Sequence, residues 1–309
     1  MNFLDHLRSS NFAKFLTLSF AVVLLLFVAL VMVSGFVLYG VLRPGPSGGQ
    51  VNPRDLLGNQ STVEVSAPGI SRREGIFFPG QQGAPTILLV HGYRASRSDL
   101  LNLALALQEN KYNVFVFDLT GHGEARGTVG FGFGESREVM AALEAVGQRT
   151  DVDQMRFGVF GVDIGGYAAL ADAANEKRIK AVAVESVYNR PVEMFDLQVQ
   201  REGLSALPLV KTFCRWTFHV MHFGNRNDPP LADRVRAMKE VPKLFLLARD
   251  TPALYASTLG IFQAAGEPRQ QELVAKSAAN MMSEEERRNY ETLVVQFFLQ
   301  NLPPIPQTD

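Results

Sequence analysis

The sequence contains a single cysteine, Cys214, among 309 residues. One thiol excludes an internal disulfide and a cluster of thiolate metal ligands, and it is compatible with a reducing or an oxidising compartment. The chain also lacks an excess of charge, because 30 Lys and Arg residues stand against 31 Asp and Glu residues without a long basic run. We therefore expect no nucleic-acid partner, and the sequence indicates no metal or cofactor.

Charge is absent altogether from residues 15–42, and 23 of these 28 residues are hydrophobic. An unbroken helix of this length is roughly 42 Å long at 1.5 Å per residue, which exceeds a hydrocarbon core of about 30 Å. The segment therefore predicts a transmembrane anchor, preceded by an N-terminal tail formed by residues 1–14.

A cleaved signal peptide is the alternative, since Arg8 and Lys14 precede the apolar run as a positive leader segment would. The run is longer than the hydrophobic part of a cleavable signal and lacks a small-residue cleavage site, which favours a retained single-pass anchor. Arg43 and Arg54 follow the run, so the bias in basic residues is small, and it favours a main domain on the extracytoplasmic side. The Gly- and Pro-containing residues 43–60 predict a flexible linker.

Short apolar runs alternate with amphipathic stretches in the rest of the chain. The clearest runs are 86–90, 114–117, 157–160, 181–184 and 244–247, with 273–274 as a weaker last member. Because these runs lack polar alternation, they predict strands of a parallel sheet covered on both faces. The order predicts an α/β domain over residues 61–303, with a doubly wound, mostly parallel sheet of about eight strands, and a tail at 304–309.

Helical spacing of apolar residues occurs between these runs, at Leu100, Leu103, Ala104 and Leu107 and again at Tyr290, Leu293, Val294, Phe297 and Phe298. Ser283 and Glu286 form a capping-box pattern at the start of the last helix. Ligands of a doubly wound sheet bind at the carboxyl ends of its strands, so the residues that follow the apolar runs are the candidates for a functional site.

Three glycine-containing segments lie at those carboxyl ends. They are His91-Gly92-Tyr93, the Asp-x-x-Gly-His-Gly-Glu segment that begins at Asp118, and the Gly-x-Asp-x-Gly-Gly segment at 161–166. In this order they resemble the α/β-hydrolase superfamily over roughly residues 62–302. The resemblance implies a sharp strand-to-helix turn that presents Asp163 at the position of the nucleophile.

The same resemblance implies the parts around Asp163. The amides of Tyr93 and Ile164 would form the oxyanion hole. The elbow and its neighbouring loop would contain His91, Gly92, Gly161, Gly165 and Gly166. A second interpretation carries equal weight: the glycines serve close packing of strand and helix alone, and that packing needs no chemistry.

Asp163 departs from the serine-hydrolase pattern, because it excludes acyl transfer through an alkoxide or thiolate at that place. Branches that resemble haloalkane dehalogenases and epoxide hydrolases do use an aspartate there. Their carboxylate forms an ester that a histidine must then help to hydrolyse.

The remaining triad positions depart as well. Asn280 stands where the resemblance places the histidine, and no histidine follows His222. An asparagine amide can orient water but cannot act as a base. The acidic position falls on Thr251, with Asp250 one residue early, and a surface or loop-capping role is the favoured interpretation of Asp250.

The other histidines have plainer interpretations. For His91 and His122 we favour hydrogen bonding within buried loops, although either could assist a reaction. His219 and His222 lie three residues apart without a further ligand in the pattern, which favours a partly buried amphipathic helix over a zinc site. That helix belongs to an apolar insertion at about 188–230, where the superfamily carries its cap. It should cover the pocket or contact another surface such as the membrane.

Residues 127–134 space their glycines without following a phosphate-binding template, and they precede a helix that begins near Glu135. A nucleotide site is therefore not expected there.

Two functional hypotheses follow. The first is a membrane-anchored protein with a degenerate triad, formed by Asp163, Asn280 and Thr251 or Asp250. It would bind a small molecule or a protein partner, or act as a scaffold, without hydrolysis. The alternative is an active hydrolase of the ester, epoxide or haloalkane class that uses Asp163. A purely structural partner-binding module would differ from both in having its pocket filled by side chains.

Overall fold

The computed structural model describes residues 11–45, 59–203, 207–225, 227–278 and 282–304. Asn280 lies outside these residues, as does most of the expected linker. The chain divides into two units by its internal contacts. The first unit contains Met1–Val41 and Phe195–Phe223, and the second contains Leu42–Met194 and Gly224–Asp309.

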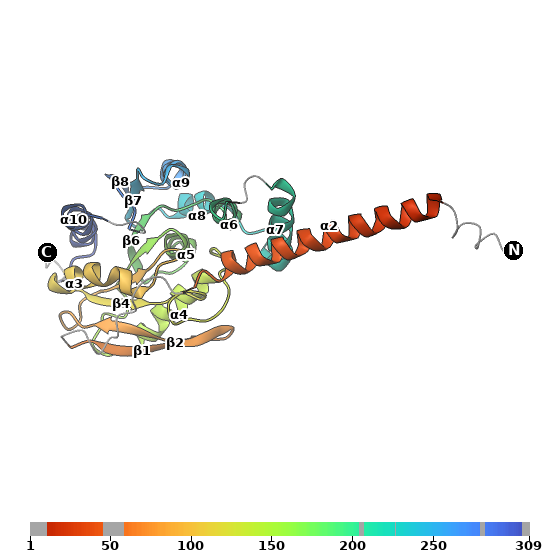
Figure 1. Cartoon of the computed structure of the whole chain (residues 1–309). Coiled ribbons are helices and arrows are strands. Elements are labelled where there is room, and N and C mark those ends of the chain that lie inside the picture. Colours follow the sequence, from red (N-terminus) through yellow and green to blue (C-terminus); the bar gives the residue numbers. More distant parts are fainter. Residues whose placement is uncertain (1–10, 46–58, 204–206, 226, 279–281, 305–309) are drawn as a thin grey trace. The chain divides into compact units, whose positions relative to one another are not determined.

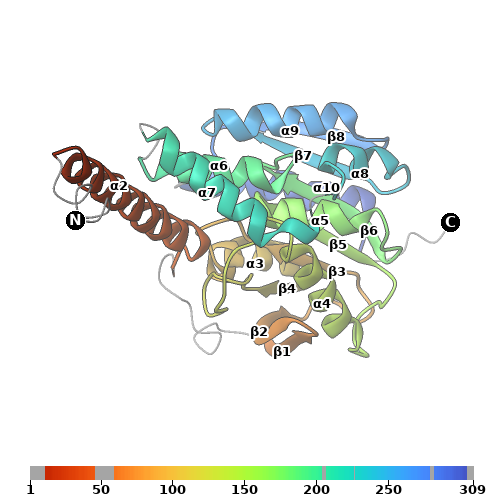
Figure 2. The same ribbon diagram turned by 90° about the vertical axis from the view of Figure 1, so that its right-hand side faces the viewer.

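An eight-stranded sheet forms the centre of the second unit (Figure 1), in the order β1-β2-β4-β3-β5-β6-β7-β8. The strands are β1 (Ser61–Ala67), β2 (Ile70–Phe78), β3 (Thr86–Val90), β4 (Asn113–Phe117), β5 (Phe157–Val162), β6 (Ile179–Glu185), β7 (Lys243–Ala248) and β8 (Arg269–Val274). β3 to β8 are parallel, and the β1–β2 hairpin joins β4 in antiparallel orientation. Figure 2 shows this hairpin and β8 toward opposite edges of the sheet. The predicted fold class is confirmed.

Every residue of β3, β4 and β5 is buried, because helices cover both faces of the sheet. The helices of this unit are η2 (Arg97–Leu100), α3 (Leu101–Glu109), α4 (Glu135–Gly147), α5 (Ile164–Ala173), α8 (Leu231–Ala237), α9 (Pro252–Ala264) and α10 (Glu284–Asn301). Figure 1 shows α3 and α10 on one side of the sheet and α4 and α5 on the other. The capping box predicted for α10 is present, with the Ser283 hydroxyl accepting from the amide of Glu286.

The first unit is helical. It contains α2 (Asn11–Leu42) apart from its last residue, the latter part of α6 (Pro191–Arg201), and α7 (Pro208–Met221). Within Ala13–Leu42 an 18-residue window has a mean hydropathy of 3.0, so this helix can cross a membrane by its length and composition. The η4 turn (Phe223–Asn225) begins where the unit ends. The insertion expected at about 188–230 is thus largely helical.

Contacts within the first unit join α2, α6 and α7. The Cys214 thiol of α7 donates to the backbone carbonyl of Ser34 in α2 at a sulfur–oxygen distance of 3.6 Å. The Phe218 ring of α7 stacks on that of Phe195 in α6, with centroids 4.2 Å apart. The end of α2 that follows Ser34 therefore belongs to a small helical cluster rather than to an isolated helix.

Candidate functional site

Asp163 lies at the turn between β5 and α5. Its φ of +38° is in the left-handed region that few residues other than glycine adopt, as the spacing of the motif predicts. The strand and helix approach closely here. A Cβ at Gly161 would lie 2.5 Å from the carbonyl carbon of Gly165, and one at Gly165 would lie 2.4 Å from the carbonyl oxygen of Val90. Close packing therefore accounts for these two glycines, whatever the turn does chemically.

The carboxylate of Asp163 points to the loop that follows β3. Its Oδ1 accepts hydrogen bonds from the amide of Tyr93, at 2.8 Å, and from the amide of Ile164. Its Oδ2 lies beside Gly92, where a Cβ would come within 2.8 Å of it. Only 5% of Asp163 is exposed. The two amides expected to form an oxyanion hole thus converge on one point, and the carboxylate of Asp163 itself stands there.

His91 is buried next to this loop and has both ring nitrogens engaged. Its Nε2 accepts a hydrogen bond from the amide of Leu119 at 2.9 Å. The ring proton must then be on Nδ1, which lies 2.8 Å from the carbonyl oxygen of Gly92. Burial lowers the pKa of His91, which keeps the ring neutral. His91 therefore ties together the loops after β3 and β4, as the structural interpretation predicts, and it has no free lone pair with which to act as a base.

His122 packs against both His91 and Tyr93, with ring centroids 5.1 Å and 5.7 Å apart. Its Nδ1 lies 3.2 Å from the carbonyl oxygen of Thr120. Its Nε2 is buried and has no hydrogen-bond partner among the described residues. Burial and, secondarily, the proximity of His91 lower the pKa of His122 to about 3. At neutral pH this imidazole is uncharged and a weak base.

Asp250 and Thr251, which follow β7, contact the loops that follow β8 and β6. Asp250 is exposed, and its Oδ1 accepts from the amide of Ser277, at 3.0 Å, in the loop after β8. Thr251 is buried, with its hydroxyl 3.3 Å from the carbonyl oxygen of Ala248 and 3.5 Å from the hydroxyl of Ser186. Asp250 thus has the loop-capping contact that its favoured interpretation expects. The position of Asn280 lies outside the described residues.

A buried carboxyl group that the sequence did not single out, that of Glu185, ends β6. It accepts hydrogen bonds from the hydroxyl of Tyr290 at 2.5 Å, the hydroxyl of Ser186 at 3.0 Å and the amide of Ala278 at 3.0 Å. Burial raises its pKa. Its backbone carbonyl also accepts from the amide of Asp163 at 2.9 Å. The one signal in the sequence is an acidic residue directly after the apolar run 181–184.

A family model, that of the alpha/beta hydrolase family, matches residues 87–301. The chain belongs to this family. Among solved structures, an esterase of Pyrococcus furiosus superposes with a TM-score of 0.66 at 17% identity, covering 84% of this chain and 98% of that one. At this identity the likeness shows the α/β-hydrolase fold alone.

Two curated relatives of this α/β-hydrolase chain match over shorter regions. The uncharacterized protein YfhR of Escherichia coli O157:H7 is 33% identical over 134 residues, which are 41% of this chain and 47% of YfhR. The alpha/beta hydrolase domain-containing protein WAV2 of Arabidopsis thaliana is 28% identical over 177 residues, which are 55% of this chain and 53% of WAV2. The chain therefore spans about half the length of the curated relatives it matches.

The glycine-spaced loop of this α/β-hydrolase chain surrounds one of its own carboxylates. The two carboxylate oxygens of Glu135 accept from the amides of Gly130 and Gly132, each at 2.7 Å, and of Gly134 at 3.2 Å. Burial, and secondarily the charge of Glu138, raise the pKa of Glu135. Backbone amides that converge in this way form a concavity suited to an anion, and here the chain supplies its own carboxyl group. The helix predicted to begin near Glu135 begins at that residue.

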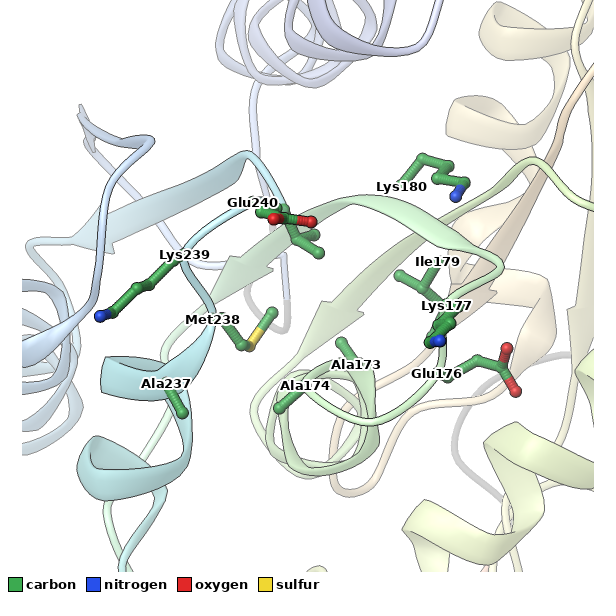
Figure 3. A pocket seen from close by; sticks show the side chains of 11 residues that line it. Ala173, Ala174, Glu176, Lys177, Ile179, Lys180, Ala237, Met238, Lys239 and Glu240 are labelled. Carbon is green, nitrogen blue, oxygen red and sulfur yellow. The ribbon is translucent and has the colours of Figure 1, made fainter.

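Away from Asp163, the described residues form a pocket but no metal site. Within the described residues, no group of three or more His, Cys, Asp or Glu side chains is placed to hold a metal ion. A pocket of about 770 Å³ (Figure 3) lies where β6 and β7 begin. Asp163 follows the end of β5, so the pocket is at the opposite end of these parallel strands. Its charged lining mixes both signs, in Glu176, Lys177, Lys180, Lys239 and Glu240. This lining gives no preference for an anionic or a cationic ligand.

Proposed function

We propose that this chain is a membrane-anchored member of the α/β-hydrolase family that binds a ligand or partner, or acts as a scaffold, without hydrolysing it. The observation that carries this proposal is the position of the Asp163 carboxylate on the amides of Tyr93 and Ile164. In acyl transfer, the carbonyl oxygen of the substrate must accept from these amides as negative charge develops on it. A substrate carbonyl cannot occupy them while Oδ1 does.

Among the described residues near Asp163, neither buried histidine is a suitable base, which supports the same conclusion. His91 uses both ring nitrogens, and the pKa of His122, about 3, is far below the range of an effective base at neutral pH. The sequence places Asn280 where the family resemblance expects the histidine, and an amide cannot take up the proton. Asp250 is engaged with the amide of Ser277, and Thr251 cannot supply a negative charge.

The membrane part of the proposal is supported by α2. An 18-residue window within Ala13–Leu42 has a mean hydropathy of 3.0, and the uncharged run of 28 residues, 15–42, exceeds what a bilayer core requires. We propose that residues 15–42 anchor the chain, that residues 43–60 form a linker, and that residues 61–303 form a hydrolase-fold domain whose insertion is a cap. The slight bias in basic residues supports an extracytoplasmic domain.

A second candidate function also involves Asp163. With Oδ1 fixed by two amides, Oδ2 could attack an electrophilic carbon, as in the haloalkane and epoxide branches of the superfamily. The carboxylate would form an ester bond while the halide leaves as an anion, or while the epoxide C–O bond opens to an alkoxide that takes up a proton from water. Release of the product then requires a water molecule that has lost a proton to a base. Without that base the reaction ends after a single turnover, with the ester still on Asp163.

The test uses the purified full-length protein in one detergent or in nanodiscs, beside an Asp163→Ala variant. We expect turnover of p-nitrophenyl esters to be equal in the two proteins and intact-mass spectra to show no adduct after incubation with alkyl halides or epoxides. Turnover well above that of Asp163→Ala would refute the non-hydrolytic function. An adduct that is absent from Asp163→Ala, without turnover, would establish the single-turnover reaction instead.

A further inference from the structure

Helix α7 (Pro208–Met221) carries three different stripes of side chains. The first is buried within the protein and consists of Val210, Cys214 and Phe218. These residues are spaced four apart and face one side of the helix. Since Cys214 and Phe218 make the contacts with α2 and α6, this stripe holds α7 in the helical cluster.

The second stripe of α7 is apolar yet exposed. Leu209, Phe213, Trp216 and Val220 follow the spacing i, i+4, i+7 and i+11, which places them on one side of the helix. Leu209 is 70% exposed, Trp216 60% and Val220 54%, while Phe213 is half-buried and its ring lies 5.9 Å from that of Trp216. Phe223, just beyond the helix, is 65% exposed. An apolar stripe of this size on a soluble surface indicates a contact with an apolar partner.

The third stripe is basic. Lys211, Arg215 and His219 are spaced four apart, and α7 contains no acidic residue. Arg215 forms an ion pair with Asp196 of α6 at 3.2 Å and remains half-exposed. A helix with basic residues on one side and tryptophan, phenylalanine and leucine on another has the composition of helices that lie in the interface of a membrane. Anionic phospholipid headgroups match the charge of this stripe.

The contact between α7 and α2 fixes where such an interface would be. Residues 14–33 of α2 contain no buried residue, whereas Ser34, Val37, Leu38 and Val41 are buried. The exposed apolar run from Phe15 to Val33 is about 28 Å long at 1.5 Å per residue, close to the thickness of a hydrocarbon core of about 30 Å. One side of α2 therefore becomes buried from Ser34 onward, where the Ser34 carbonyl accepts from the Cys214 thiol of α7, while Phe36 and Tyr39 on its other side remain exposed.

We propose that α7 is a second membrane contact, which lies in the interface of an anionic phospholipid bilayer beside the end of the α2 span. The side chains of Leu209, Trp216 and Val220 enter the acyl-chain boundary, and those of Lys211 and His219 meet the lipid phosphates. This inference rests on the proposed anchoring by α2. It goes beyond that anchoring, because it assigns a lipid-binding surface to a helix in the middle of the chain.

Trp216 is the single tryptophan of the chain, so its fluorescence reports on α7 alone. The experiment reconstitutes the full-length protein in vesicles whose anionic or zwitterionic phospholipids carry bromine at defined acyl carbons. We expect bromolipids to quench Trp216, at a depth of about 5–10 Å below the headgroup boundary, and iodide in the water to quench it little. Quenching by iodide without quenching by bromolipid would overturn the proposal. Protection from both quenchers would overturn it too, because it would indicate a protein contact.

Two matched variants complete the experiment. In Trp216→Phe combined with Met155→Trp, the tryptophan moves to an exposed position of the second unit, and we expect iodide to quench it. In Lys211→Gln with His219→Gln, which leaves the Arg215–Asp196 ion pair in place, we expect the quenching by anionic bromolipid to fall to the level in zwitterionic lipid, and unchanged quenching would contradict the role of the basic stripe. Extraction with alkaline carbonate tests the α2 anchor separately. If the protein stays in the membrane but iodide in the water quenches Trp216, the lipid contact of α7 is refuted and the α2 anchor is not.

Discussion

Replacement of Asp163 by alanine should destabilise the folded protein. The change removes the acceptor from the amides of Tyr93 and Ile164, and a buried donor left without a partner costs about 1–3 kcal/mol, so the two together cost about 2–6 kcal/mol. Asp163→Asn keeps an oxygen acceptor and should lose less. Asp163→Gly should be more stable than Asp163→Ala by about 1–2 kcal/mol, because glycine adopts the positive φ without a steric penalty.

Thermal unfolding of the full-length variants in a single detergent, followed by circular dichroism, measures this series. For a domain of this size the loss in Asp163→Ala corresponds to a decrease in Tm of roughly 4–24 °C. Asp250→Ala is the matched control, since it removes an exposed carboxylate that accepts from one loop amide, and its effect should be smaller. Replacement of a residue that serves catalysis often leaves a protein as stable or makes it more stable, whereas loss of a structural acceptor destabilises it. A variant Asp163→Ala as stable as the original protein would therefore show that this carboxylate is not a structural acceptor.

Two further predictions concern burial and close packing. Folding lowers the pKa of His122 from its usual 6.5 to about 3, so between these values the unfolded chain binds a proton that the folded protein does not. The free energy of unfolding should therefore decrease as the pH falls below 6.5, by about 2 kcal/mol at pH 5. His122→Gln should remove this part of the slope in unfolding measured from pH 7 to 5; equal slopes would contradict it. Gly165→Ala places a Cβ 2.4 Å from the carbonyl oxygen of Val90 and should reduce the yield of folded protein. The control is Gly260→Ala in α9, which has open space around it and should be neutral or stabilising by about 0.5–1 kcal/mol. Normal yield and Tm in Gly165→Ala would show that strand and helix can separate here.

The central strands could be predicted because burial on both faces leaves a continuous apolar run in each of them. β1 and β2 could not be located individually, because most of β1 alternates half-buried and exposed residues and the start of β2 is mostly exposed and carries charged side chains. The start of the last helix, α10, could be predicted for another reason. The Ser283 and Glu286 pair of α10 forms contacts within one helical turn, so its pattern is local and survives in the sequence.

The candidate site was predictable only in its backbone. The spacing around Asp163 predicts a tight turn, and the amides of Tyr93 and Ile164 do converge beside it. The direction of the carboxylate depends on a contact between residues 70 positions apart, which no local pattern encodes. Glu185 was missed for the same reason, since its partners Ala278 and Tyr290 lie about 100 residues further along the chain.

The position of the Asp163 carboxylate also has a consequence for any ligand that approaches the same amides. A group attached to the chain and already oriented loses no further translational and rotational freedom when it binds, which favours it over the same group on a dissolved metabolite. A free carboxylate or ester would therefore have to compete with an internal ligand that never diffuses away. These amides are already occupied by a group of the protein, so an external ligand gains access only after the side chain of Asp163 rotates away from them.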